Sequence, residues 1–415
     1  MAPLRIGFGV PRYVGDPAQA FSPPDHRQIL RYAQRAERAG FDSVWVPDHI
    51  FFESPPGVFE PYPEAWTLMT AIAATTQRVQ VGSLVLAAGF RHPALMAKMA
   101  GALQELSEGR LLLGIGAGNQ PVEHAAFGLG FDGRVGRFAE YVSIVHGLLA
   151  GERLTLQGRY YTLTDASLLM PNPPVPIWIA AGGERMLGLA ARYGSGWNGG
   201  GGVSGDGRQF REKLAALRQA CEKIGRNPDE IEISCSANVL VLPSTAEVDA
   251  QVAHMAAAIP GATERDVRDR YVIGTPDEVA ARLRQALDWG ATHLICSLGG
   301  RPFTLWSDAV LDLFAPALRA ASPKGRGGRT KKRDLAGGAR SLVRCGCVFG
   351  SGVSRRRARR RARRRARAPG CDRDGARPRR GRALTLPWCS SPPWRWWRRW
   401  SPASWRQHWP RSSRR

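Results

Sequence analysis

Short apolar stretches alternate with longer amphipathic stretches along residues 4–320, and this alternation predicts a succession of strands and helices. Val81–Leu86 and Leu111–Ile115 are apolar on both faces, as expected of strands buried in a parallel sheet. Eight strands are predicted, if the short sixth one is counted: Arg5–Val10, Ser43–Pro47, Val79–Leu86, Leu111–Gly116, Pro176–Ala181, Ser195–Asn198, Ile231–Val241 and Thr292–Ser297.

Stretches with a helical period lie between these strands. Glycines such as Gly40, Gly109 and Gly290 follow them, where a left-handed helix cap is favoured. Asp25 and Thr275–Asp277 have the residue types of helix starts. The predicted helices are Asp25–Ala39, Pro63–Thr75, Ala94–Leu106, Arg137–Leu149, Glu184–Tyr193, Gln209–Ile224, Asp277–Trp289 and a terminal helix, Leu305–Leu318.

This succession predicts an α/β fold, namely a TIM (β/α)8 barrel with insertions. The alternative is an open doubly wound parallel sheet. Gly114–Asn119 resembles a dinucleotide-binding glycine fingerprint, but it follows the fourth strand and ends in Asn, whereas that fingerprint opens the first unit of its domain. Leu154–Leu163 is expected to form an inserted hairpin, and residues 199–207 and 259–273 are expected to be loops.

The charge of the chain is concentrated at its C-terminal end. Residues 323–415 hold 30 of the 59 basic residues and three of the 35 acidic ones, which leaves residues 1–322 with 29 basic and 32 acidic residues. The sequence therefore predicts a barrel domain, residues 1–322, followed by a basic low-complexity tail, residues 323–415. A nucleic-acid-binding role for the barrel domain is disfavoured, because it has no excess of cations to neutralise phosphates.

The tail is rich in Arg, Trp and Pro, and self-repulsion is expected to keep it disordered. One interpretation is an arm that binds nucleic acid or an anionic membrane, with Arg for phosphates and Trp for stacking. The favoured interpretation is a segment under no selection for folding, such as an out-of-frame translation of GC-rich DNA, since its residues have GC-rich codons. Any binding of nucleic acid would then be non-specific.

Several classes of protein are disfavoured by what the sequence lacks. It has no apolar run long enough for a membrane span and no signal-peptide pattern at its start. The three cysteines of residues 1–322 are far apart and lack metal-site spacing, which favours a reducing cytoplasm and no metal centre. No GxSxG, HExxH or Walker-type motif is present, so serine hydrolase, zinc protease and P-loop roles lack support.

Polar residues follow several of the predicted strands, and in a TIM barrel the active site lies at those C-terminal strand ends. Asp48 and His49 follow the second strand, Asn119 follows the fourth, and Gly182–Gly183 follow the fifth just before a helix. Two glycines at a helix N-terminus allow a phosphate to approach the backbone closely. His49 has a side chain that exchanges protons around neutrality.

Each of these residues also has a purely structural interpretation. Asp48 could cap a turn, Asn119 could stabilise its own turn, and Glu123 could form only an ion pair. The glycine pair could simply make a tight turn. His92, His124 and His293 are not part of any convincing catalytic arrangement in the sequence.

Taken together, the chain resembles the luciferase-like monooxygenase superfamily, specifically the branch that uses the deazaflavin coenzyme F420. The resemblance covers nearly all of residues 4–320 in the family's order. It is carried by Ala39–His49, Arg91–Pro93, Leu106–Arg110, Leu113–Gly118, Glu123–Gly128, Gly158–Tyr161, Pro176–Gly183, Ala190–Tyr193 and Gly196–Asn198.

The resemblance implies a TIM barrel with a flavin-like cofactor at the strand ends. It places Asp48 and His49 beside the reactive ring, and a cis peptide bond between Leu84 and Val85 against the ring's other face. It also implies backbone contacts to the cofactor from Ala180, Ala181, Gly182 and Gly183. Asn119 is a further cofactor-binding candidate; some members have an acid there, so a proton-donor role at this position is lost. Ser195 stands where the family often has Asp.

The expected function is therefore hydride transfer between the deazaflavin and a small organic substrate. His49 is the candidate acid/base or electrostatic partner, and Asp48 is expected to orient it. One alternative is a luciferase-like monooxygenase that uses flavin mononucleotide (FMN), and another is a nucleic-acid-binding protein that acts through the tail. Residues 51–61 and 199–207 are expected to shape the substrate pocket, and a homodimer is one option for the assembly.

Overall fold

The computed structural model describes residues 4–15, 22–53, 57–169, 173–203, 205–259, 261–300 and 302–321. All of them belong to one compact unit, Met1–Lys332, and the second unit, Arg333–Arg415, lies outside the described residues. The predicted boundary at residue 322 and the predicted disordered tail also lie outside them, so both stay predictions.

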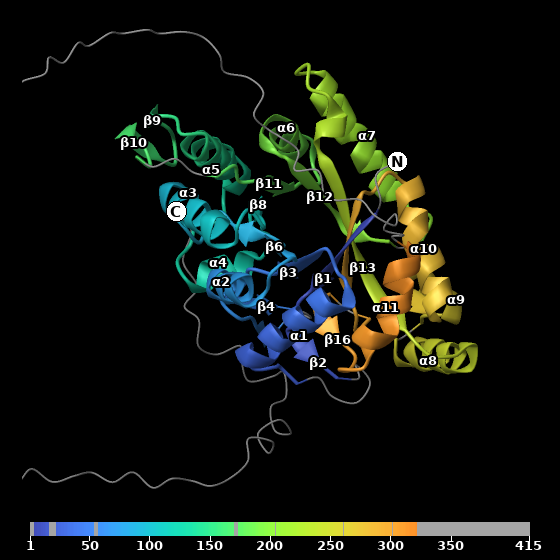
Figure 1. Cartoon of the computed structure of the whole chain (residues 1–415). Coiled ribbons are helices and arrows are strands. Elements are labelled where there is room, and N and C mark those ends of the chain that lie inside the picture. Colours follow the sequence, from blue (N-terminus) through green and yellow to red (C-terminus); the bar gives the residue numbers. More distant parts are fainter. Residues whose placement is uncertain are drawn as a thin grey trace, which may run out of the picture. The chain divides into compact units, whose positions relative to one another are not determined.

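Eight parallel strands close into a barrel, which confirms the predicted TIM architecture over the open sheet (Figure 1). Closure follows from β11, which pairs in parallel with β8 on one side and with β12 on the other. In their order around the barrel the strands are β1 (Arg5–Gly9), β3 (Ser43–Val46), β6 (Gln80–Ser83), β8 (Leu111–Gly116), β11 (Ile177–Ala180), β12 (Gly196–Gly202), β13 (Glu232–Val241) and β15 (His293–Ser297).

The helices surround the barrel, and both predicted helix starts are confirmed. Asp25 caps the first helix in a reciprocal capping box with Gln28, and Thr275 forms the same motif with Glu278. None of the described helices has the length and apolar character needed to cross a bilayer. The helices are α1 (His26–Ala39), α2 (Ala65–Thr75), α3 (Pro93–Leu106), α4 (Pro121–Ala126), α5 (Arg134–Leu149), α6 (Glu184–Tyr193), α7 (Arg208–Glu222), α8 (Thr245–Ala258), α9 (Glu264–Arg270), α10 (Pro276–Asp288) and α11 (Val310–Ala321).

The insertions differ in part from what the sequence predicts. The hairpin of β9 (Leu154–Gln157) and β10 (Thr162–Ala166) is confirmed. Residues 259–273 are not simply a loop, because they contain α9 and most of β14, and residues 199–202 extend β12. The remaining short strands are β2 (Tyr13–Val14), β4 (Phe51–Glu53), β5 (Phe59–Pro61), β7 (Leu86–Ala87), β14 (Val272–Gly274) and β16 (Thr304–Leu305).

Two tryptophans fill the barrel interior. Trp45 and Trp178 are fully buried and pack at 5.1 Å between ring centroids. Glycines on the neighbouring strands make room for them, since a Cβ at Gly82 would lie 2.5 Å from the Trp45 ring and one at Gly196 would lie 2.3 Å from the Trp178 ring. Large side chains and adjacent glycines thus interlock in place of the usual branched aliphatic layers.

A buried polar network lies at the opposite end of the barrel from the strand C-termini. His293 is fully buried; its Nδ1 is 2.9 Å from Glu232, and its Nε2 is 2.7 Å from the hydroxyl of Ser43. Arg5 binds Glu232 with one guanidinium nitrogen at 2.9 and 3.1 Å. Each of these residues is at or within one residue of the start of its strand, so the network ties the N-terminal ends of β1, β3, β13 and β15 together.

This network predicts a pH-dependent stability. Burial lowers the pKa of His293 below its usual 6.5, although Glu232 opposes the shift. The unfolded chain therefore binds a proton that the folded chain refuses, so stability is full above about pH 6.5 and falls as the pH drops below it. In denaturant unfolding between pH 7 and 5.5, His293→Gln should remove a slope of up to about 1.4 kcal/mol per pH unit. The same change at exposed His26 should leave the slope intact; an unchanged slope in His293→Gln would contradict this assignment.

Candidate active site

A cavity of about 430 Å³ lies where the strands end. Its walls come from the ends of several strands and the loops that follow them, so residues far apart in the chain meet there. Among the residues that line it are Asp48, His49, Leu84, Val85, Ala87, Ala117, Gly118, Asn119, Glu123, His124, Arg134, Ala180, Met186, Asn198, Gly200, Ser236 and Phe303.

The cavity brings together most of the site residues predicted from the sequence. The charged pair Asp48–His49, the pair Leu84–Val85, and the single residues Asn119 and Ala180 all line it. Ala181, Gly182 and Gly183 continue from Ala180 in the turn that leads into α6. The peptide bond between Leu84 and Val85 is cis, which is the geometry that the resemblance implies.

Asp48 does not orient His49 in the way the sequence suggested. Its carboxylate accepts hydrogen bonds from both terminal nitrogens of Arg91, at 2.7 and 3.1 Å, and from the backbone N–H of Ala87 at 3.0 Å. Burial lowers the pKa of Arg91, but the hydrogen bonds and charges of Asp48 and Glu64 outweigh this and raise it overall, so the guanidinium stays charged. Asp48 thus fixes the loop after β3 to β7 and to the start of α3.

His49 is held instead by Glu123, which the sequence left as a simple ion pair. The Nδ1 atom of His49 is 3.1 Å from a carboxylate oxygen of Glu123, and Glu123 is only 1% exposed. The edges of Phe52 and Tyr62 surround the imidazole, with centroid distances of 4.9 and 5.1 Å. Burial raises the pKa of Tyr62 to about 12, so this phenol stays neutral beside the site.

The turn before α6 is open to a ligand. A Cβ at Gly183 would meet nothing within 4 Å, and one at Gly182 would meet only the ammonium of Lys213, at 4.0 Å. Gly183 is the N-cap of α6 and offers no side-chain hydrogen bond, so the first backbone N–H groups of this helix lack a side-chain cap. These features suit an anionic group.

Asn198, at the level of Ala180 on the neighbouring strand, carries a second signal. It is 4% exposed, and its side-chain Nδ2 has no hydrogen-bond partner within the described residues. A buried amide without a partner is costly, so a ligand that accepts a hydrogen bond there would be stabilised. Neither Asn198 nor Lys213 was selected from the sequence, although Asn198 ends the predicted sixth strand and is found by the same strand-end rule as Asn119.

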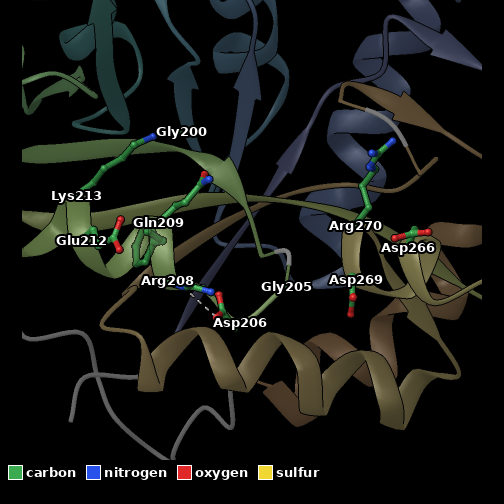
Figure 2. A pocket seen from close by; sticks show the side chains of 12 residues that line it. Gly200, Gly205, Asp206, Arg208, Gln209, Glu212, Lys213, Asp266, Asp269 and Arg270 are labelled. Carbon is green, nitrogen blue, oxygen red and sulfur yellow. Dashed lines mark hydrogen bonds and ion pairs between the residues drawn. The ribbon is translucent and has the colours of Figure 1, made fainter. Parts of the chain in front are cut away.

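A second pocket, of about 740 Å³, adjoins the first at Gly200 (Figure 2). It lies between α7 and α9, and its basic residues are balanced by acidic ones. Arg208 pairs with Asp206, as the dashed line in Figure 2 marks, and Arg270 lies beside Asp266. Because none of the predicted catalytic residues lines it, the cavity at the strand ends is the candidate active site.

A closed barrel with a buried imidazole and a glycine turn at its C-terminal strand ends defines a TIM-barrel enzyme. The sequence matches the family "Luciferase-like monooxygenase" over residues 9–293. The chain therefore belongs to the luciferase-like monooxygenase family, as its sequence predicted.

Individual relatives agree with this assignment. The chain is 34% identical to an F420-dependent glucose-6-phosphate dehydrogenase from Beutenbergia cavernae, over 70% of this chain and 90% of the relative. It is 28% identical to the crystal structure of monooxygenase RslO1 from Streptomyces bottropensis, with a TM-score of 0.61, covering 76% of this chain and 98% of that one. An F420-dependent secondary alcohol dehydrogenase with an F420-acetone adduct shares the fold, with a TM-score of 0.62 at 20% identity, over 77% of this chain and 99% of that one.

Proposed function

We propose that this protein is an F420-dependent oxidoreductase that moves a hydride between the deazaflavin and a small organic substrate. The observation that carries the proposal is the meeting of His49, the cis Leu84–Val85 bond and the Ala180–Gly183 turn at one cavity. The relatives named as F420-dependent dehydrogenases support this choice of cofactor. FMN is the alternative, supported by a structural relative titled a monooxygenase.

The residues present suit such a cofactor. The open turn at Gly182–Gly183, with Lys213 beside it, would hold a phosphate. The unpartnered amide of Asn198 would donate a hydrogen bond to an oxygen of the ligand. Leu84 and Val85 would support one face of the ring, and Asn119 would border it. Bound deazaflavin supplies or accepts a hydride and reacts poorly with oxygen.

The chain's own residues then divide the remaining work. His49 would take a proton from a substrate hydroxyl, or return one to a carbonyl oxygen, at its Nε2 atom. Phe303 and Met186 line the same cavity and would exclude water from it. Asp48, tied to Arg91 and Ala87, would keep the loop that carries His49 in place.

The substrate proposed is small and uncharged. The ring and the substrate would share a cavity of about 430 Å³, which leaves little room for a large substrate. Among the described residues that line it, Arg134 alone is a lysine or arginine, and it stacks on Phe131 at 4.3 Å. This is a poor site for a dianionic sugar phosphate, although relatives are named glucose-6-phosphate dehydrogenases.

Two further points belong to this proposal and not to the findings. Cys221, Cys235 and Cys296 are buried free thiols, which supports a reducing cytoplasmic location. A homodimer, and any non-specific binding of nucleic acid through residues 323–415, remain predictions.

The cofactor part of the proposal is tested at Gly183. Gly183→Val should weaken the binding of F420 at least about tenfold, because a branched side chain would fill the space left for the phosphate. The melting temperature should change little, since that space is empty of protein atoms. Binding is followed by fluorescence titration, and Gly188→Val, in the same helix with equally open space, is the control. Equal losses of stability and affinity at Gly183 would make this glycine a turn residue only.

A further inference from the structure

Glu123 is a buried carboxylate whose hydrogen bonds converge on the loop that carries His49. One oxygen accepts from the backbone N–H groups of Ile50 and Phe51, the latter at 3.3 Å. The other oxygen is 3.1 Å from Nδ1 of His49. In the described part of the chain, His49 is the one basic side chain within ion-pair distance of this carboxylate. A charge with 1% exposure and no arginine or lysine beside it is costly to keep, which calls for a compensating role.

This contact determines which nitrogen of His49 carries the proton in the neutral ring. An ionised carboxylate only accepts hydrogen bonds, so Nδ1 must be the donor. Nε2 then has a lone pair and is free to act as a base. When Nε2 takes up a proton, the carboxylate lies next to the resulting imidazolium and stabilises its charge.

The neighbouring carboxylate cannot take this part. Asp48 is occupied by both terminal nitrogens of Arg91 and by the N–H of Ala87. Its charge is therefore already neutralised, and its hydrogen bonds are directed away from the imidazole.

We propose that Glu123 is the positioning residue of His49: it fixes the tautomer with the proton on Nδ1, so that Nε2 is the atom that exchanges a proton with the substrate. The proposal rests on the proposed function. In the direction of alcohol oxidation the O–H bond breaks and the proton goes to Nε2. The electron pair left on oxygen forms the carbonyl double bond as the carbon gives up its hydride to the oxidised cofactor.

The test is the tautomer of His49 in Glu123→Gln. A glutamine can still accept from the backbone of Ile50 through its oxygen, but its NH2 group would donate to Nδ1 and drive the proton to Nε2. In the nitrogen-15 spectrum of the cofactor-free protein, with the His49 signals identified by their loss in His49→Gln, the wild type should show the Nδ1–H form. Glu123→Gln should show the Nε2–H form.

Turnover is the second readout. Glu123→Gln should lower kcat at least about thirtyfold while KM and the affinity for F420 change less than about threefold, because the substrate and cofactor contacts remain. Glu140→Gln is the matched control, since Glu140 also accepts from three backbone N–H groups, those of Arg159, Tyr160 and Tyr161, but holds no histidine. It should alter neither the tautomer of His49 nor turnover.

Three results would overturn the proposal. These are an Nε2–H tautomer in the wild type, an unchanged tautomer in Glu123→Gln, or an inverted tautomer with unchanged kcat. The wild-type spectrum alone decides the tautomer if the variant does not fold. Because that spectrum needs neither cofactor nor substrate, a wild type without F420 turnover would refute the proposed function separately from the positioning by Glu123.

Discussion

Replacing His49 by alanine is expected to slow turnover about a hundredfold or more, which corresponds to roughly 2.7 kcal/mol of activation free energy. His49 lines the cavity at the level where the strand ends converge, and its ring is held by Glu123. Loss of the imidazole removes the group that exchanges a proton with the substrate, whereas the backbone contacts to the cofactor remain. Affinity for F420 should therefore change much less than the rate.

Three measurements on one preparation check this result: the dissociation constant for F420, the single-turnover rate and the melting temperature. A screen of small alcohols, ketones, enones and imines supplies the substrate, and neutral alcohols should react faster than glucose-6-phosphate. His254→Ala, at an exposed histidine, is the control and should behave as the wild type. A lowered melting temperature with near-normal turnover in His49→Ala would make this histidine structural.

Gly114→Ala is expected to destabilise the barrel by about 3 kcal/mol or more. A Cβ at Gly114 would lie 1.9 Å from the backbone oxygen of Ser83, and a backbone atom cannot move aside as a flexible side chain can. The Ser83 hydroxyl also donates to the Gly114 carbonyl at 2.7 Å and accepts from its N–H at 3.0 Å. The added methyl group would force β6 and β8 apart at the point where these hydrogen bonds join them.

Denaturant unfolding measures this loss directly. Gly188→Ala is the matched control, because Gly188 lies inside α6 with nothing within 4 Å of the added Cβ. Alanine is favoured over glycine in a helix, so this variant should gain about 0.5–1 kcal/mol. A loss of less than about 1 kcal/mol in Gly114→Ala would contradict the packing described for these two strands.

The barrel could be predicted from the sequence because its strands are apolar on both faces. The range Leu111–Gly116 is confirmed residue for residue, and the strands at Ser43 and Ile231 differ by one residue at an end. The insertions carry weaker patterns. In α8 the buried residues are Val248 and Val252 alone, and α9 is almost entirely charged apart from Val267, so neither helix has a continuous apolar face.

The membership of the site was easier to predict than its internal contacts. The strand-end rule and the resemblance together select Asp48, His49 and Asn119, because their sequence positions fix their place at the mouth of the barrel. Which carboxylate holds His49 depends on how the loops after β3 and β8 pack on each other. The sequence neighbour Asp48 was therefore the wrong choice, and Glu123, 74 positions away along the chain, makes the contact.

The interior packing was also beyond the reach of sequence patterns. Gly82 and Gly196 resemble ordinary strand glycines, and their role is visible only when Trp45 and Trp178 are placed on the neighbouring strands. The basic tail lies outside the described residues, and its predicted disorder stays a prediction.

The central claim, that the strand-end cavity binds a deazaflavin, is tested most directly by titrating the purified full-length chain with coenzyme F420 and, separately, with FMN, following fluorescence. The account predicts saturable binding of F420 at one site per chain, at least about tenfold tighter than that of FMN, and weakened by Gly183→Val. Tighter binding of FMN, or F420 binding that Gly183→Val leaves unchanged, would contradict it.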